Sequence, residues 1–180
     1  HSYNFPRSGT SSMKKYDALV YIGRFQPLHI GHCSVIDKAL GLAERVIIVL
    51  GSACSSITIK NPLTDFERCK MFEINYEEEI RKGLITFVLA KDNRYDHASW
   101  VRTVKSSVYS KIFSGDWKAG SYNIGIIGYD KDHSSFYLKN FDCWDLELVE
   151  PEFPEIHSTV IRENSFVLSK FNTPHHLLKW

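Results

Sequence analysis

The sequence lacks long apolar runs, paired cysteines and an excess of charge of one sign. No apolar run approaches the roughly 20 residues that a membrane span needs, and no signal peptide is recognisable. Its 4 cysteines are scattered without a C-x-x-C pair, which argues against a zinc ribbon and a dithiol redox motif. The formal net charge is +1. We therefore expect neither membrane nor nucleic acid as a partner, and the scattered thiols favour a reducing, cytoplasmic location.

The length of the chain fits one domain with a substantial core. It has 180 residues, of which 43% are hydrophobic and 24% charged, as in ordinary globular proteins. Residues 1–12 carry serine and glycine without hydrophobic periodicity, so we interpret them as the remnant of an expression tag. Residues 13–180, which begin at a methionine, are expected to form a single domain.

Strand-like and helix-like segments alternate along the chain. Short apolar or β-branched runs predict strands at residues 18–22, 45–51, 84–90, 123–127 and 144–149. Apolar periodicity predicts helices at residues 30–43, 64–82, 97–113 and 134–138, with a last helix opening within 156–162. Thr64 and Glu67 form a capping-box pattern. This alternation predicts an α/β fold, a Rossmann-like doubly wound parallel sheet of about five strands with helices on both faces.

Two common nucleotide-binding motifs are absent. The chain has no G-x-x-x-x-G-K-[ST], and its first strand–helix junction has no G-x-G-x-x-G. We therefore expect neither a P-loop kinase nor a dinucleotide-binding dehydrogenase. Ligands of doubly wound sheets bind outside the carboxyl ends of the strands, where the strand order reverses. The loops that follow residues 22, 50, 90 and 127 should share that edge.

The first of these loops holds the most informative stretch of the chain. Residues 23–32 read Gly-Arg-Phe-Gln-Pro-Leu-His-Ile-Gly-His, so His29 and His32 stand at the start of a predicted helix, with Gly31 between them. Amides at a helix start are unpaired and the helix dipole is positive there, which favours anions. Imidazoles at the same place indicate a polyphosphate rather than a metal, and Gly31 would let a phosphate approach the backbone closely.

This stretch resembles the H-x-G-H signature of the nucleotidyltransferase superfamily. Residues 156–162, Ile-His-Ser-Thr-Val-Ile-Arg, resemble that superfamily's second signature, I-S-S-T-x-x-R. Residues 60–68 are similar to a segment of archaeal-type nicotinamide mononucleotide (NMN) adenylyltransferases, and residues 128–138 to the G-H-x-K-D-x-S-S-x-Y-L stretch of their bacterial relatives. Many of those relatives carry a Nudix hydrolase domain, whose motif does not occur here. The resemblance implies that residues 13–180 are one nucleotidyltransferase domain.

The chain departs from these patterns at two positions. Tyr129 stands where the bacterial relatives usually have histidine, and His157 where the second signature usually has serine. Neither change removes an expected charged group. We therefore expect altered adenine or phosphate contacts rather than loss of activity.

The reaction that the resemblance implies is ATP + NMN → NAD⁺ + pyrophosphate. The NMN phosphate attacks the α-phosphorus of ATP in line, and because that phosphate is already anionic near neutral pH, no general base is required. Catalysis then depends on positioning and on stabilising the departing pyrophosphate.

The resemblance assigns the phosphate-binding groups. His29 and His32 would act on one flank of the triphosphate and Arg162 on the other, as the catalytic residues. The ATP-binding residues would be Gly23, Arg24, Phe25, Gly31, Gly128, Lys131, Ser158 and Thr159. Ser158 or Thr159 would cap the last helix, and the planar fork of Arg162 suits phosphate oxygens. Arg68 is either functional or part of a structural ion pair.

The acceptor site follows from the same resemblance. Trp100 matches a tryptophan that stacks on the nicotinamide ring, and His97 a polar contact three residues earlier. Asp92 would reach the NMN ribose or carboxamide, and Lys60 matches a phosphate-contacting arginine. The other tryptophans, Trp117, Trp144 and Trp180, are expected to be structural.

The partners expected are the nucleotides ATP, NMN and NAD, with Mg²⁺ held mainly by ATP phosphates and water, because no carboxylate cluster predicts a protein metal site. Relatives are commonly oligomeric, which implies a homo-oligomer. Two alternatives stay open: an adenylyltransferase that acts on phosphopantetheine or flavin mononucleotide, and a non-catalytic sensor that binds NMN or NAD.

Overall fold

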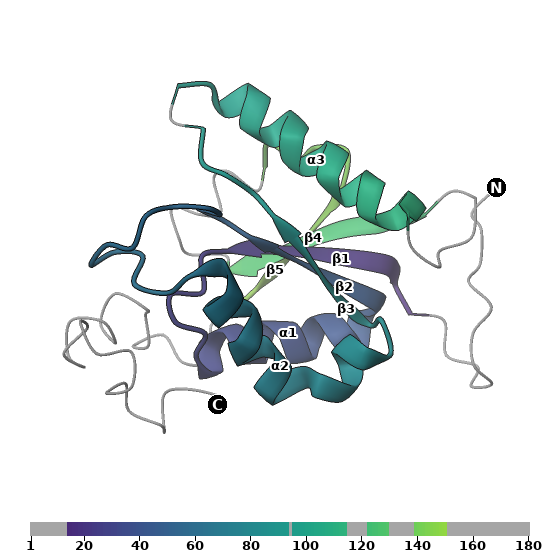
Figure 1. The fold of residues 1–180 in the computed structure, drawn as a ribbon. Helices are drawn as coiled ribbons and strands as arrows, with labels where there is room; N and C mark the ends of the chain where they lie inside the picture. Colours follow the sequence, from purple (N-terminus) through teal and green to yellow (C-terminus); the bar gives the residue numbers. More distant parts are fainter. Residues whose placement is uncertain (1–13, 94, 115–121, 130–138, 151–180) are drawn as a thin grey trace.

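A five-stranded parallel sheet forms the centre of the molecule (Figure 1). The computed structural model describes residues 14–93, 95–114, 122–129 and 139–150. The strands are β1 (Tyr16–Gly23), β2 (Ala43–Leu50), β3 (Ile85–Leu89), β4 (Ile124–Tyr129) and β5 (Asp145–Val149). The helices are α1 (Ile30–Leu42), α2 (Asp65–Arg81) and α3 (His97–Ser114). The predicted helices at 134–138 and within 156–162 lie outside the described residues.

The sheet has the order β3-β2-β1-β4-β5, and all four neighbouring pairs are parallel. Figure 1 shows α1 and α2 on one face of the sheet and α3 on the other. The predicted α/β class, the five strands and the helices on both faces are confirmed. β1 lies at the centre because its Val-, Leu- and Ile-rich run is buried on both faces.

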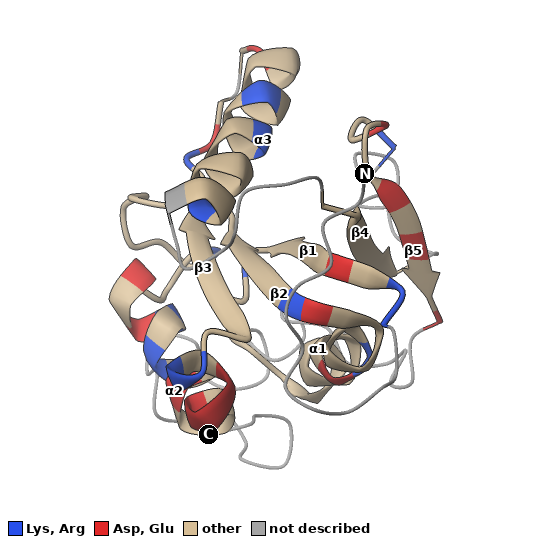
Figure 2. Ribbon diagram, turned by 90° about the vertical axis from the view of Figure 1, so that its right-hand side faces the viewer, with Lys and Arg blue, Asp and Glu red and all other residues tan. Residues whose placement is uncertain are grey.

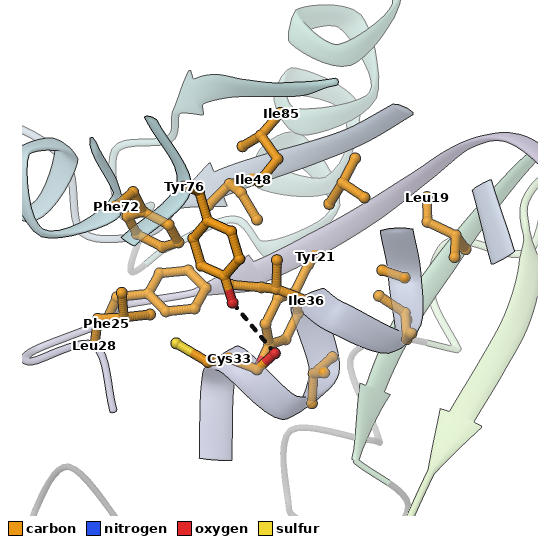
Figure 3. Close-up of a cluster of buried hydrophobic side chains, with 14 of the residues drawn as sticks. Leu19, Tyr21, Phe25, Leu28, Cys33, Ile36, Ile48, Phe72, Tyr76 and Ile85 are labelled. Carbon is orange, nitrogen blue, oxygen red and sulfur yellow. Dashed lines mark hydrogen bonds between the residues drawn. The ribbon is translucent and has the colours of Figure 1, made fainter. Parts of the chain in front are cut away.

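Two hydrophobic clusters fill the space between sheet and helices. The cluster under α1 and α2 includes Phe25, Ile36, Phe72 and Tyr76 (Figure 3). The cluster under α3 is built from one stripe of that helix, Val101, Val104, Val108 and Ile112, together with Phe141 and Trp144. Trp144 is buried and its indole N–H donates to the Tyr109 hydroxyl at 3.1 Å, which confirms its structural role.

The main differences from the predicted elements concern their ends. The predicted strand over 123–127 extends to Tyr129, because Gly128 and Tyr129 pair with Leu148 and Val149 of β5. The predicted capping box of α2 is confirmed. The hydroxyl of Thr64 accepts a hydrogen bond from the amide of Glu67, and the carboxylate of Glu67 accepts one from the amide of Thr64.

Charges of both signs are distributed over the described surface. Figure 2 shows acidic and basic residues interleaved along α2. α3 carries the basic residues Arg102, Lys105 and Lys111 and no acidic residue. Among the described residues, no helix combines the length and the apolar character that crossing a bilayer requires.

Candidate active site

The parallel arrangement brings the carboxyl ends of β1, β2, β3 and β4 to one edge of the sheet. From β1 the sheet extends through β2 and β3 on one side and through β4 and β5 on the other. The boundary between β1 and β4 is therefore the point at which the winding reverses, where ligands of such sheets bind. α1 begins at this edge, after the loop that follows β1 (Figure 1).

The first turn of α1 is a capping box made of two histidines. His29 is the N-cap residue, and its Nδ1 accepts hydrogen bonds from the amides of Gly31 at 3.0 Å and His32 at 3.3 Å. In return, the amide of His29 donates to Nδ1 of His32 at 3.2 Å. The two rings stack with centroids 3.7 Å apart and planes inclined by 18°. The two predicted catalytic histidines thus share one tightly bonded turn.

These bonds alter the expected source of anion affinity. We expected unpaired amides at the helix start, but the amides of Gly31 and His32 already donate to His29. The expectation is wrong for these two amides, because an N-cap side chain takes the donors that a phosphate would otherwise accept from. The amides of Gly31 and His32 are therefore already used within the turn.

The capping box also sets the tautomer of both rings. An imidazole nitrogen that accepts a hydrogen bond carries no proton. Because Nδ1 is the acceptor in His29 and in His32, each neutral ring carries its proton on Nε2 and is a donor through that atom. Nε2 is therefore the atom through which each ring can donate; His29 is buried, with 3% of its surface exposed, and His32 is half-buried.

Burial keeps His32 uncharged. Desolvation lowers the pKa of His32 well below its usual 6.5, and the neighbouring His29 lowers it further. At pH 7 His32 is consequently a neutral hydrogen-bond donor, which is suited to stabilising anionic oxygens rather than to transferring protons.

Aromatic packing holds this turn against the core. Phe25 is 1% exposed, and its ring packs edge-on against His32 at 4.8 Å and Phe72 at 5.0 Å between centroids. A Cβ on Gly23 would lie 2.9 Å from the Phe25 ring. Gly23 and Phe25, both predicted to bind ATP, therefore have clear packing roles, and a contact of Phe25 with ATP would involve its backbone.

Gly31 has a packing role as well. A Cβ at this position would lie 2.8 Å from Cε1 of His29 and 3.2 Å from the hydroxyl oxygen of Tyr129. The space that we expected a phosphate to approach is thus occupied by protein atoms. Glycine is required here because the His29 ring lies over it.

Two buried polar side chains fasten the loops around the turn. Gln26 donates to the Leu63 carbonyl at 3.0 Å and accepts from the Leu63 amide at 2.9 Å. Arg68, 1% exposed, donates from Nη1 to the carbonyls of Arg24 at 2.7 Å and Gly51 at 2.6 Å. These contacts favour the structural interpretation of Arg68, which ties the ends of β1 and β2 to α2.

Asp65 completes this connection. It accepts a hydrogen bond from Nη2 of Arg68 at 2.7 Å and another from the amide of Cys54 at 2.9 Å. Desolvation acts to raise the pKa of Asp65, but the bonds from Arg68 and Cys54 outweigh it and hold the pKa below its usual 3.8. The Asp65 carboxylate therefore remains ionised at neutral pH.

The side chains of two predicted phosphate-binding cations are exposed. Arg24 follows β1 directly, with its backbone held by Arg68. Lys60 lies in a turn in which the amide of Thr58 donates to the carbonyl of Asn61 and the amide of Asn61 donates back to the Thr58 hydroxyl. Both cations belong to loops at the carboxyl edge of the sheet.

The predicted acceptor residues form two groups near the end of β3. Asp92 accepts a hydrogen bond from the buried Ser52, which follows β2, at 2.8 Å. His97 and Trp100 stack at the start of α3 with centroids 5.7 Å apart, and the edge of Trp100 packs against Phe141 at 6.0 Å. Trp100 is half-buried, so it joins the core while part of its ring is accessible.

Of the remaining predicted site residues, Gly128 is buried in β4 and pairs with Leu148 of β5. The others lie outside the described residues: Lys131, Ser158, Thr159 and Arg162. Sequence reasoning missed Gln26 and Ser52, whose roles depend on contacts with distant loops. The described residues contain no group of three side chains suited to a metal ion.

Comparison with known proteins agrees with this geometry. The sequence model of the cytidylyltransferase-like family matches residues 20–164. The nicotinamide/nicotinic acid mononucleotide adenylyltransferase of Acinetobacter baylyi is 40% identical over 151 residues, which are 84% of this chain and 76% of that protein. The nicotinamide-nucleotide adenylyltransferase of Pyrococcus abyssi is 36% identical over 99 residues, 54% of this chain and 53% of the relative.

A solved structure is similar over nearly the whole chain. It is a bifunctional NMN adenylyltransferase/ADP ribose pyrophosphatase from Francisella tularensis, complexed with AMP and a manganese ion, with a TM-score of 0.76 and 26% identity. The match covers 92% of this chain but 45% of that one, so the chain spans about half the length of the bifunctional enzyme. Together with the histidine turn, these matches show that the chain belongs to the cytidylyltransferase-like family, among the NMN adenylyltransferases.

Proposed function

We propose that this chain transfers the adenylyl group of ATP to NMN and so forms NAD⁺ and pyrophosphate. An oxygen of the NMN phosphate forms a bond to the α-phosphorus, and the bond from that phosphorus to the α,β-bridging oxygen breaks. Pyrophosphate leaves with the electron pair of that bond. The names of the relatives and the position of the histidine turn at the switch point support this reaction.

The observation that carries the proposal is the reciprocal hydrogen bonding of the histidine pair, in which Nδ1 of each ring is the acceptor, so that Nε2–H remains as the donor. Negative charge grows on the departing phosphates, and fixed donors aimed at that charge stabilise the transition state. His29 and His32 supply two neutral Nε2–H groups that the capping box orients before ATP arrives. On the other flank of the triphosphate, the resemblance implies contacts from Arg162, Ser158, Thr159 and Lys131. These contacts stay a prediction.

Trp100 is proposed as the platform for the pyridinium ring of NMN. A cationic ring on an indole face gains about 0.5–2 kcal/mol from cation–π attraction, depending on desolvation. His97 stacks on Trp100, and Phe141 limits the movement of the indole. Asp92, held by Ser52, is proposed to accept hydrogen bonds from the ribose or carboxamide of NMN.

Mg²⁺ is proposed to enter with ATP. It would neutralise part of the triphosphate charge, held mainly by ATP phosphates and water; the similar F. tularensis enzyme was solved with AMP and a manganese ion, which supports a divalent cation at such a site. We also propose that the chain acts in the cytoplasm. We further propose that it forms a homo-oligomer, which sedimentation velocity can test.

The test is an acceptor panel. The purified chain is incubated with ATP and Mg²⁺ and with NMN, nicotinic acid mononucleotide, phosphopantetheine or flavin mononucleotide, and pyrophosphate release is measured. We expect rapid release with NMN and only background release with phosphopantetheine and flavin mononucleotide. Rapid turnover with either of these, without turnover of NMN, would overturn the proposal. NMN binding without any pyrophosphate release would favour a sensor instead.

A further inference from the structure

Tyr129 connects the end of β4 to the histidine turn. It is the last residue of β4, and its hydroxyl donates to the carbonyl of Gly31 at 2.5 Å. This bond crosses the boundary between β1 and β4, the reversal point of the sheet. Residues 98 positions apart in the sequence are thereby joined at the site.

Gly31 is the residue through which this bond reaches the histidines. Its amide donates to Nδ1 of His29 at 3.0 Å, while its carbonyl accepts from Tyr129. The His29 ring and the Tyr129 hydroxyl both lie within 3.2 Å of the position that a Cβ of Gly31 would take. The Gly31 carbonyl shares its peptide group with the amide of His32, which donates to Nδ1 of His29 at 3.3 Å, so a rotation of that peptide group would disturb the bond to His29.

We propose that Tyr129 is a positioning residue for His29 and His32. Its hydroxyl fixes the first turn of α1, so that Nδ1 of His29 stays an acceptor and the proton of each ring stays on Nε2. The part of this inference that concerns the departing phosphates rests on the proposed adenylyl transfer. The part that concerns the tautomers does not.

The test uses Tyr129→Phe, which removes only the hydroxyl, and Tyr16→Phe as a matched control. The Tyr16 hydroxyl donates to Glu147 at 2.8 Å, and Tyr16 is the first residue of β1, at the opposite edge of the sheet. Each variant loses the hydroxyl of one tyrosine, Tyr129 at the carboxyl edge of the sheet and Tyr16 at the opposite edge. Because Glu147, the acceptor of Tyr16, is a carboxylate that also pairs with Lys15, we expect Tyr16→Phe to lower the Tm at least as much as Tyr129→Phe.

The first measurement is steady-state kinetics. A small displacement of reacting groups lowers catalysis steeply, so we expect kcat of Tyr129→Phe to fall about tenfold, with the KM for NMN changed less than about twofold. Tyr16→Phe should keep the kcat of the parent chain. An unchanged kcat in Tyr129→Phe, or an equal loss in both variants, would overturn the positioning role.

The second measurement is independent of activity. Imidazole ¹⁵N chemical shifts of the substrate-free protein report the tautomer of each ring, and in the parent chain both histidines should be in the Nε2–H form. We expect a measurable Nδ1–H population in Tyr129→Phe and none in Tyr16→Phe. Identical shifts in all three proteins would overturn the inference, as would a Tyr129→Phe variant that does not fold.

The two proposals fail in distinguishable ways. If the parent chain releases no pyrophosphate with any acceptor, the proposed function fails, while the ¹⁵N shifts still decide whether Tyr129 sets the histidine tautomers. If the parent chain is active, but Tyr129→Phe has the same ¹⁵N shifts and the same kcat as the parent chain, only the positioning role of Tyr129 fails.

Discussion

At the residue scale, His29 has two roles that sequence patterns treat separately: it caps a helix and presents a proton donor next to the cap. Strong N-cap patterns rely on serine, threonine, aspartate or asparagine, so a capping box made of histidines carries no familiar signature. The pattern of residues 23–32 placed His29 and His32 at a helix start, and the structure has them in the first turn of α1. The pattern could not reveal that the helix amides are occupied, because that depends on the rotamer of one imidazole.

Replacing His29 by asparagine separates the two roles. Asparagine is a good N-cap, so we expect the Tm of His29→Asn to stay close to that of the parent chain. Loss of the Nε2–H donor should lower kcat by about 10²-fold or more with little change in the KM for NMN. His29→Ala, which loses the cap as well, should in addition lose about 1 kcal/mol of stability. Equal kcat for His29→Asn and the parent chain would contradict the donor role.

The lowered pKa of His32 predicts a stability change with pH. The unfolded chain binds a proton at this residue near pH 6.5 and the folded chain does not, so the contribution of His32 is complete above about pH 6.5 and is lost as the pH falls below it. The control is His32→Gln, whose side chain can still accept a hydrogen bond from the His29 amide. Between pH 7.5 and pH 5.5, the free energy of unfolding measured in urea should fall more for the parent chain than for His32→Gln. An equal fall in both proteins would contradict the lowered pKa of His32.

At the element scale, sequence periodicity located the described helices and strands because each has one apolar stripe or one β-branched run. It placed the end of β4 two residues early, since Gly128 and Tyr129 become strand through pairing with β5, a partner that local patterns do not show. The periodicity that predicts a helix over 97–113 comes from Val101, Val104 and Val108, which the structure buries in the cluster under α3. Helical spacing alone would also have placed Trp100 in the core.

Trp100→Ala tests whether α3 contributes a platform to the site. Loss of stacking and cation–π attraction should raise the KM for NMN about tenfold and leave kcat within about threefold. Phe113→Ala is the control, because Phe113 is an aromatic residue on the same helix but 65% exposed near its far end. A KM for NMN that is unchanged in Trp100→Ala would remove this residue from the site.

At the scale of the whole molecule, the sequence pattern predicts a parallel sheet whose strand ends share one edge, but it does not predict the order of the strands. Strand order and the bonds between loops depend on contacts between distant residues, such as Gln26 with Leu63 and Arg68 with Arg24. These contacts leave no local pattern, because a buried glutamine or arginine is recognised only when its partners are in place. The sequence accordingly left two interpretations of Arg68 open.

Arg68→Met tests the connection between loops. The substitution removes the cation that donates to the carbonyls of Arg24 and Gly51 and to the carboxylate of Asp65, which keeps its bond from the Cys54 amide. We expect this loss to cost about 3–5 kcal/mol in the free energy of unfolding. Arg81→Met, which removes an exposed i,i+3 pair with Glu78, should cost less than about 0.5 kcal/mol. Both values are measured by urea unfolding, and equal losses would contradict the structural role of Arg68.

Two exposed cysteines lie at opposite edges of the parallel sheet and can be labelled separately. The exposed thiols are Cys54, in the loop after β2, and Cys143, just before β5, while Cys33 is buried and Cys69 half-buried. A strand of 8 residues, such as β1, is roughly 26 Å long. A maleimide dye on Cys143 of a Cys54→Ser variant would therefore anchor or report on the protein without crowding the nucleotide edge, whereas a dye on Cys54 would stand at the entrance to that edge.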